Sequence, residues 1–336
     1  MKKWSKRKLG ILIFCICFVL SYVGGIRYLY NSLEYVEGQG VDSTKRQVAL
    51  ITKSTESAFW KSVFAGANAS ATEYNIQLTI HGPESEEDYE AQNEMLRMAA
   101  DQGAEVIIFS AVDYNGNADT INELIAQGIQ VIIIDSDVNS EFVSCRIGTD
   151  NYVAGQMAGE AALESTEEEL YIGIVNFDVN SENGQAREAG FLDIVSEDSR
   201  VQEIHTINVI STTEDAMTGT KELLEEYPNI NVIATFNEWT SLGVGYAIKE
   251  FRLGEEIRVV AFDSNVVSVG MLETGEVDAL IVQNPYAMGY LGVEYAYYLL
   301  NDSSITEEDI DTSTTLVTRD NMFEESYQKV LFAFDE

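Results

Sequence analysis

The chain has 336 residues, 46% of them hydrophobic, and carries 20 Lys and Arg against 56 Asp and Glu, which gives a formal net charge of −36. This charge argues against nucleic-acid binding, because phosphate contacts need clustered Lys and Arg. The length suffices for about two domains with cores of their own, and three cysteines provide no disulfide framework.

The amino terminus has the pattern of an export segment. Five Lys and Arg within the first eight residues precede 18 uncharged residues, 9–26, rich in Leu, Ile, Phe and Val. The positive-inside rule places the basic end in the cytoplasm and the rest of the chain outside the membrane. We expect residues 1–29 to be an uncleaved anchor that spans the membrane through 9–26, although small residues near position 25 leave a cleaved signal peptide open. Residues 30–45 would be a stalk or linker.

A buried strand that launches a helix follows this linker. Val48–Ile51 is short, apolar and partly β-branched, as a central parallel strand would be, and helical spacing begins soon after it. Phe59 and Trp60 fall in the first turn of the helix, above the carboxyl end of the strand. Ligands of open parallel α/β sheets bind at this end, so both aromatic residues are candidates for a binding site. Burial in the core is their alternative role.

Strand and helix patterns alternate from here to near the carboxyl terminus, which predicts βαβ units and parallel sheets. The further strand candidates are 77–81, 106–110, 131–135, 171–176, 201–208, 232–237, 259–263 and 279–283. Helices are predicted between them, for example at 87–102 and 285–300, and a last strand is predicted at 314–318.

Five of these strands end in a hydrogen-bonding residue. They are Ser110, Asp135, Asn237, Asp263 and Gln283. Any one of them could be an ordinary helix N-cap. Because the carboxyl ends of parallel strands share one edge of a sheet, the five together with Phe59 and Trp60 predict the lining of a cleft.

Several segments, in order and spacing, resemble the type I periplasmic sugar-binding proteins of the ribose-binding family. The most specific is IGTDN-x-x-AG at 147–155. The others are Ala58-Phe59-Trp60, the strand end at Asp135, AREAGF at 186–191, FNE at 236–238, VAFD at 260–263 and VQNPYAMGY at 282–290. The resemblance covers nearly all of 46–321.

The resemblance implies two doubly wound parallel-sheet lobes joined by a three-segment hinge. The amino-terminal lobe would hold residues 46–149 and 284–311, and the carboxyl-terminal lobe residues 150–283 and 312–336. We expect a hinge motion at the three crossings, near 149–150, 283–284 and 311–312.

The resemblance also assigns roles in the cleft. It makes Phe59 and Trp60 stacking aromatics, and it makes hydroxyl binders of Asp135, Arg187, Asn237, Asp263 and Gln283. These residue types suit a sugar, whose C–H faces match aromatic rings and whose hydroxyls match carboxylates, amides and a guanidinium. Arg187 would also offset the buried charge of Asp135 or Asp263.

Ser57, Ser110 and Ser136 are also candidate ligand-binding residues, but they depart from the ribose-binding pattern. Ser57 and Ser110 stand where that pattern has Asn, and Ser136 stands where it has Arg. The first lobe therefore lacks one cation and two amides. This leaves another pentose, a hexose, a polyol or a related signal molecule open as the ligand.

The predicted function is an extracytoplasmic, membrane-tethered carbohydrate receptor in the cell envelope, which captures its ligand by lobe closure and presents it to an ABC importer. A sensor-kinase ectodomain is the alternative partner. A glycosidase using Asp135 and Asp263 is less favoured, because neither has a reason for a raised pKa in the sequence. A transcription regulator of the lactose-repressor type is opposed by the export segment.

We expect no cofactor, metal or catalytic residue. The two histidines, His81 and His205, lie far apart in the sequence. No glycine-rich phosphate loop follows a strand. The segment 178–184 only faintly resembles a calcium loop, and we expect it to be a loop over the cleft.

Overall fold

The computed structural model describes residues 45–303, 305 and 307–332. The predicted signal or anchor segment at 1–29, and nearly all of the stalk predicted at 30–45, lie outside these residues. Within the described part of the chain, no helix combines the length and the apolar character needed to cross a bilayer.

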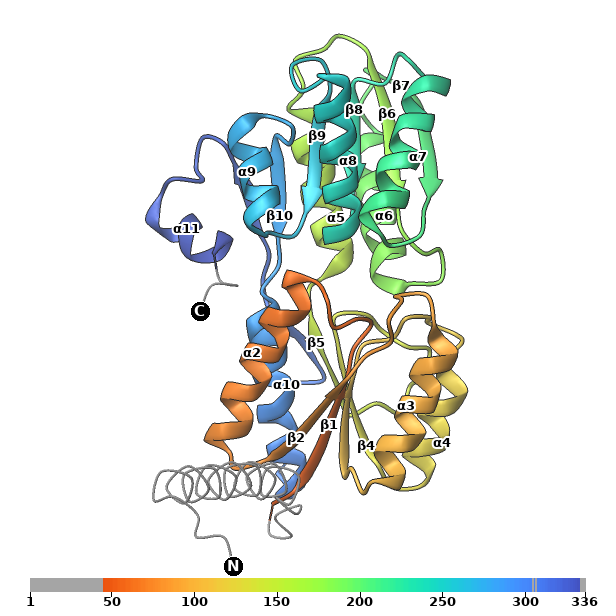
Figure 1. Ribbon diagram of the computed structural model, residues 1–336, viewed down its shortest axis with the longest axis vertical. Coiled ribbons are helices and arrows are strands. Elements are labelled where there is room, and N and C mark those ends of the chain that lie inside the picture. The colour runs from red at the N-terminus through yellow and green to blue at the C-terminus, as the bar shows by residue number, and fades with distance from the viewer. Residues whose placement is uncertain (1–44, 304, 306, 333–336) are drawn as a thin grey trace, which may run out of the picture. The chain divides into compact units, whose positions relative to one another are not determined.

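The first lobe is built on a six-stranded parallel sheet of order β11-β5-β4-β3-β1-β2. Its strands are β1 Gln47–Ile51, β2 Gln77–His81, β3 Val106–Phe109, β4 Gln130–Ile134, β5 Cys145–Gly148 and β11 Asp309–Asp311. Helices α2 (Ala58–Glu73) and α10 (Pro285–Leu300) cover one face, and α3 (Tyr89–Asp101) and α4 (Ala118–Ala126) cover the other (Figure 1). The central strands β1, β3 and β4 are almost wholly buried, which explains their continuous apolar runs.

The second lobe has a sheet of order β12-β10-β9-β8-β6-β7, in which only β12 runs antiparallel to its neighbour among the described strands. Its strands are β6 Leu170–Asn176, β7 Val201–Asn208, β8 Val232–Thr235, β9 Arg258–Phe262, β10 Ala279–Val282 and β12 Thr315–Thr318. Helices α5 (Asn151–Leu163) and α6 (Glu182–Val195) share one hydrophobic core with this sheet. The other core holds α7 (Thr213–Glu226), α8 (Glu238–Phe251), α9 (Val266–Thr274) and the end of α11 (Glu325–Leu331).

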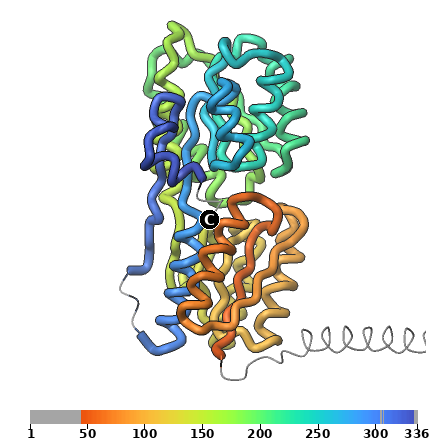
Figure 2. Tube along the Cα trace, turned by 60° about the vertical axis from the view of Figure 1, so that its left-hand side comes forward, coloured from red at the N-terminus to blue at the C-terminus, as the bar shows by residue number. Residues whose placement is uncertain are grey.

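The described chain passes between the two sheets three times: after β5, after β10 and after β11. The crossings touch one another. Thr149 Oγ1 donates a hydrogen bond of 2.9 Å to Gln283 Oε1, and the Thr312 N–H donates one of 2.8 Å to Gly148 O. Figure 2 shows the blue crossing segments running along one side of the two lobes.

The helix pair beside each sheet is held close by glycines. A Cβ on Gly289 of α10 would lie 1.9 Å from Val63 O of α2. In the second lobe, a Cβ on Gly155 of α5 would lie 2.1 Å from Arg187 O of α6, and one on Gly190 would lie 2.0 Å from Tyr152 O. Only glycine permits such an approach of two backbones, so the α5–α6 contact fixes the position of Arg187.

The predicted strands and helices are present, with shifted ends. Strands expected to include Ser110, Asp135 and Asp263 end one residue before each of them. The helix predicted at 87–102 begins at Tyr89, because Asp88 caps it and accepts a hydrogen bond of 2.9 Å from the Ala91 N–H. Strand β5 was not predicted, since its four residues alternate between buried and half-buried positions and form no apolar run.

Candidate functional site

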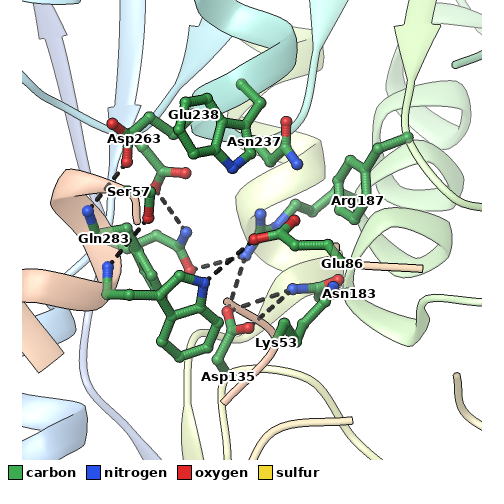
Figure 3. Close-up of a pocket in the computed structure, with 14 residues that line it drawn as sticks. Lys53, Ser57, Glu86, Asp135, Asn183, Arg187, Asn237, Glu238, Asp263 and Gln283 are labelled. Atoms are coloured by element: carbon green, nitrogen blue, oxygen red, sulfur yellow. Dashed lines mark hydrogen bonds and ion pairs between the residues drawn. The ribbon is translucent and has the colours of Figure 1, made fainter. Parts of the chain in front are cut away.

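A cavity lies between the carboxyl ends of the two sheets. Side chains from both lobes line it, and ten of them are labelled in Figure 3. Eight of the ten residues predicted from the sequence are among the lining residues: Ser57, Phe59, Trp60, Asp135, Arg187, Asn237, Asp263 and Gln283.

The other two predicted residues, Ser110 and Ser136, do not line the cavity, because each is completely buried. Ser110 Oγ donates to Asp135 Oδ2 at 3.1 Å and so holds a lining side chain from behind. Ser136 Oγ has no hydrogen-bond partner among the described residues. A polar residue at a strand end thus faces either the cleft or the core, and the sequence pattern does not distinguish the two.

Arg187 of α6 is the most buried charged side chain of the site, with 1% of its surface exposed. Its guanidinium stacks over the Phe262 ring, 4.8 Å from the ring centre. Nε donates to Asn151 Oδ1 at 2.9 Å, Nη1 to Phe236 O at 2.6 Å and Nη2 to Gln283 Oε1 at 2.7 Å. A guanidinium has five N–H groups, so two remain without a hydrogen-bond acceptor among the described residues.

Asp135 and Asp263 occupy equivalent positions, each directly after a central strand of its sheet. Both adopt the left-handed backbone region, with φ of 59° and 66°. Such a conformation is uncommon outside glycine and clusters at functional sites. Asp135 accepts hydrogen bonds from Ser110 Oγ and from Asn183 Nδ2, and Asp263 Oδ1 accepts one of 2.7 Å from Gln283 Nε2.

Both carboxylates interact electrostatically with the buried guanidinium of Arg187. Asp135 Oδ1 is 3.9 Å from Arg187 Nη2. Burial raises the pKa of Asp263 to about 7, although Arg187 and the Gln283 amide both favour its ionised form. Burial also lowers the pKa of Arg187, against the attraction of Asp263 and Asp135. The sequence had given no reason for a raised pKa at Asp263, and burial supplies it.

The aromatic side of the cavity is formed by Phe59 and Trp60. Their rings meet edge to face, with centroids 5.0 Å apart and planes at 89°. Ser57 caps α2 by accepting a hydrogen bond of 3.2 Å from the Trp60 N–H, and Glu86 Oε1 accepts one of 3.2 Å from the indole Nε1. Both rings line the cavity and also belong to the core of the first lobe.

Six lining residues were not predicted: Lys53, Glu86, Phe177, Asn183, Glu238 and Trp239. Phe177 directly follows β6 and Lys53 lies two residues after β1, but the strand-end residues predicted to line the cleft included neither an aromatic residue nor a lysine. Lys53 Nζ donates to Ser181 Oγ at 2.7 Å and lies 5.1 Å from the centre of the Phe177 ring. Asn183 lies in the first turn of α6, which begins at Glu182, so the segment 178–184 that was expected to be a loop over the cleft is helical from 182 on.

Glu238 crosses between the lobes. Its carboxylate accepts hydrogen bonds from the Ala58 N–H at 3.2 Å and from the Phe59 N–H at 3.0 Å, both in the first turn of α2. Asn265 Nδ2 donates a third, of 3.0 Å. A carboxylate at the amino terminus of a helix also interacts favourably with the helix dipole.

The chemistry of the lining is that of hydrogen bonding and stacking. Within the described residues no three His, Cys, Asp or Glu side chains are grouped so that they could hold a metal ion. The site offers carboxylate and amide acceptors, guanidinium and ammonium donors and aromatic rings, which can match the hydroxyls and C–H faces of a small polyhydroxylated molecule.

A family model described as the periplasmic binding protein domain matches residues 48–304. The chain belongs to this family. It is a type I periplasmic sugar-binding protein, a binding protein and not an enzyme, and the family places it outside the cytoplasm.

Three relatives illustrate the likeness of this periplasmic binding protein. The D-ribose/D-allose-binding protein of Pseudomonas aeruginosa is 23% identical over 293 residues, which cover 82% of this chain and 89% of that one. The crystal structure of a sugar transporter from Clostridium phytofermentans matches with a TM-score of 0.73 and a sequence identity of 32%. The match covers 82% of this chain and 99% of that chain. A carbohydrate transporter solute-binding protein from Agrobacterium radiobacter, in complex with D-arabinose, is 25% identical with a TM-score of 0.83, and the match covers 86% of this chain and 99% of that chain.

Proposed function

We propose that this protein captures a neutral monosaccharide or polyol in the cavity between its lobes and presents it to an ABC sugar importer, while residues 9–26 tether it to the membrane. The observation that carries the proposal is the hydrogen-bonded row Arg187–Gln283–Asp263 opposite Phe59 and Trp60. Two free N–H groups of Arg187 and the acceptors of Asp263 would bind ligand hydroxyls, and the rings would contact its C–H faces.

The charges of the lining favour a neutral ligand. Four carboxylates (Glu86, Asp135, Glu238 and Asp263) and two cations (Lys53 and Arg187) line the cavity, which gives 2 − 4 = −2 when all six are ionised. In the cavity, an anionic ligand would lie close to more carboxylates than cations. Charges in such a buried site are poorly screened, so the ligand would be repelled. A neutral sugar avoids this repulsion.

Closure would be the signal that the partner reads. Residues 46–149 and 284–311 would move against residues 150–283 and 312–336 about the three crossings. Because the ligand would contact both lobes only when they meet, it would bind the closed form better and shift the population towards it. The relatives named as transporters support an importer as the partner, and a sensor-kinase ectodomain is the alternative.

Thermal-shift screening tests this proposal. The full-length chain in detergent would be melted with D-ribose, D-allose, D-arabinose, other pentoses and hexoses, and polyols, and in parallel with sugar acids and sugar phosphates. A ligand that binds only the native state raises the melting temperature by mass action. We expect at least one neutral sugar or polyol to do so. A shift caused only by sugar acids or sugar phosphates would contradict a neutral ligand.

A further inference from the structure

The mouth of the cleft is the side farthest from the three crossings. The crossings adjoin β11 and β12, which are edge strands of their sheets, whereas β2 and β7 are the opposite edges. The loop after β2 carries Glu86, and the loop after β7 carries Ser211. Ser211 Oγ donates a hydrogen bond of 2.8 Å to Glu86 Oε2, so the two loops join at the mouth.

This contact is the centre of a continuous row of hydrogen bonds across the mouth. In the first lobe, Trp60 Nε1 donates to Glu86 Oε1 at 3.2 Å. In the second lobe, Asn237 Nδ2 donates to Ser211 Oγ at 2.8 Å. The row therefore connects a proposed stacking residue of one lobe with a proposed hydroxyl binder of the other. Figure 3 shows Glu86 and Asn237 on the same side of the cavity.

The surroundings explain why closure needs such a contact. Burial raises the pKa of Glu87, the neighbour of Glu86. The carboxylates of Asp178 and Asp215 from the second lobe raise the pKa of Glu87 further. Like charges therefore approach one another as the mouth closes, and this repulsion opposes closure. A hydrogen bond to an ionised carboxylate is among the stronger kinds. Ser211 is 7% exposed, so water competes little for its hydroxyl.

We infer that Glu86 and Ser211 form a clasp, defined here as this pair, which holds the mouth closed and positions Trp60 and Asn237. Both are positioning residues. Ser211 does not line the cavity, so it acts on the ligand only through the closed state. Apparent affinity falls in proportion to the fraction of binding-competent molecules, so a weaker clasp weakens binding without the loss of a ligand contact. This effect on affinity rests on the proposed function, whereas the clasp itself does not.

The test compares two serines. Ser211→Ala removes the hydroxyl of the clasp. Ser140→Ala is the matched control, because Ser140 is also buried, at 6% exposure, and its Oγ donates to Asn122 Oδ1 at 2.7 Å within the first lobe. Dyes on Glu123→Cys of α4 and Glu222→Cys of α7, both exposed positions, report the distance between the lobes. Cys15 and Cys17 are replaced by serine, and the buried Cys145 stays.

Single-molecule energy transfer on the full-length chain in detergent is recorded without sugar and with a mixture of D-ribose, D-allose and D-arabinose. We expect Ser211→Ala to lower the closed-to-open ratio and raise the opening rate by roughly 10- to 150-fold, the range for one hydrogen bond to a charged acceptor. Ser140→Ala should match the wild type. Equal ratios and opening rates in Ser211→Ala and wild type would overturn the clasp, as would the absence of a closed state under both conditions. If the sugars change nothing while the ligand-free ratio still depends on Ser211, the clasp stands and these three sugars are excluded as ligands.

Discussion

Arg187 and Gln283 come from different elements of the second lobe and meet in a hydrogen bond of 2.7 Å between Nη2 and Oε1. The same Oε1 accepts a hydrogen bond from Thr149 Oγ1 at the first crossing, and Gln283 Nε2 donates to Asp263. A single amide thus connects the buried guanidinium, a buried carboxylate and the hinge. Changes at the binding surface and changes in the hinge should therefore be coupled.

Removal of Arg187 should abolish useful sugar binding. Arg187→Ala leaves Asp263 and Asp135 without their buried counter-charge and removes two N–H groups that are free for a ligand. We expect a loss of roughly 2 to 4 kcal/mol in binding free energy, the scale for a buried charged partner. Calorimetric titration measures it, with the exposed Arg97→Ala as control. An Arg187→Ala variant that binds as tightly as Arg97→Ala would show that the guanidinium does not contact the ligand.

Trp60 should contribute through both its ring and its indole N–H. Trp60→Ala removes the stacking surface, and we expect it to lose roughly 2 to 4 kcal/mol of binding free energy. Trp60→Phe keeps a ring but loses the hydrogen bond to Glu86, so its loss should be smaller. Titration of both variants with the same sugar separates the two contributions. Equal losses in the two variants would contradict a stacking role.

Asp263 should make stability depend on pH. Its pKa is raised from 3.8 to about 7 by burial, so between these values the unfolded chain is ionised there while the folded chain keeps the proton. The folded state then binds more protons, and the free energy of unfolding falls as pH rises through this window, by at most about 4 kcal/mol. The Asp263→Asn variant has no carboxyl group at this position, so its free energy of unfolding does not fall in this way. Relative to the wild type, its stability should therefore increase from pH 4 to pH 7. Chemical unfolding at several pH values measures the difference, and a difference that stays constant with pH would contradict the buried acid.

Gly155 should be intolerant of a side chain. Its Cβ would clash with the carbonyl of Arg187 at 2.1 Å, so Gly155→Ala must push α5 and α6 apart. We expect a destabilisation of roughly 1 to 3 kcal/mol, together with weaker sugar binding. Gly270→Ala in α9 is the matched control, because a Cβ there meets no heavy atom within 4 Å and alanine favours a helix. Equal melting temperatures of the two variants would be the contrary result.

The positions of the strand-end residues at the cavity could be predicted from the sequence because they follow from local patterns. Asp135, Asn237 and Asp263 each follow an apolar run, and parallel sheets bring such ends together without further information. Glu238 and Asn183 escape this reasoning, since each acts on a partner in the other lobe. Glu238 lies at the start of a helix, where an acidic residue is ordinary, and only the docking of α2 against it reveals its role.

The serines show a different limit. Ser110 has the same sequence signal as Asp135 and Asp263, and Ser136 follows Asp135 directly, yet both serines are completely buried. A short hydroxyl side chain can turn inwards and bond a neighbour, as Ser110 does with Asp135, whereas a carboxylate is costly to bury without partners. The chemistry of the residue, and not its place after a strand, therefore decides which strand ends face the cleft.

Calorimetric titration of the full-length chain with the sugar or polyol that gives the largest thermal shift, at low and at high salt, tests the central claim most directly. We predict one saturable site with a dissociation constant on the order of micromolar, about −8 kcal/mol, and nearly the same value at both salt concentrations, because a neutral ligand has no charge to screen. A steep loss of affinity at high salt, or no saturable binding of any neutral sugar or polyol, would contradict the claim.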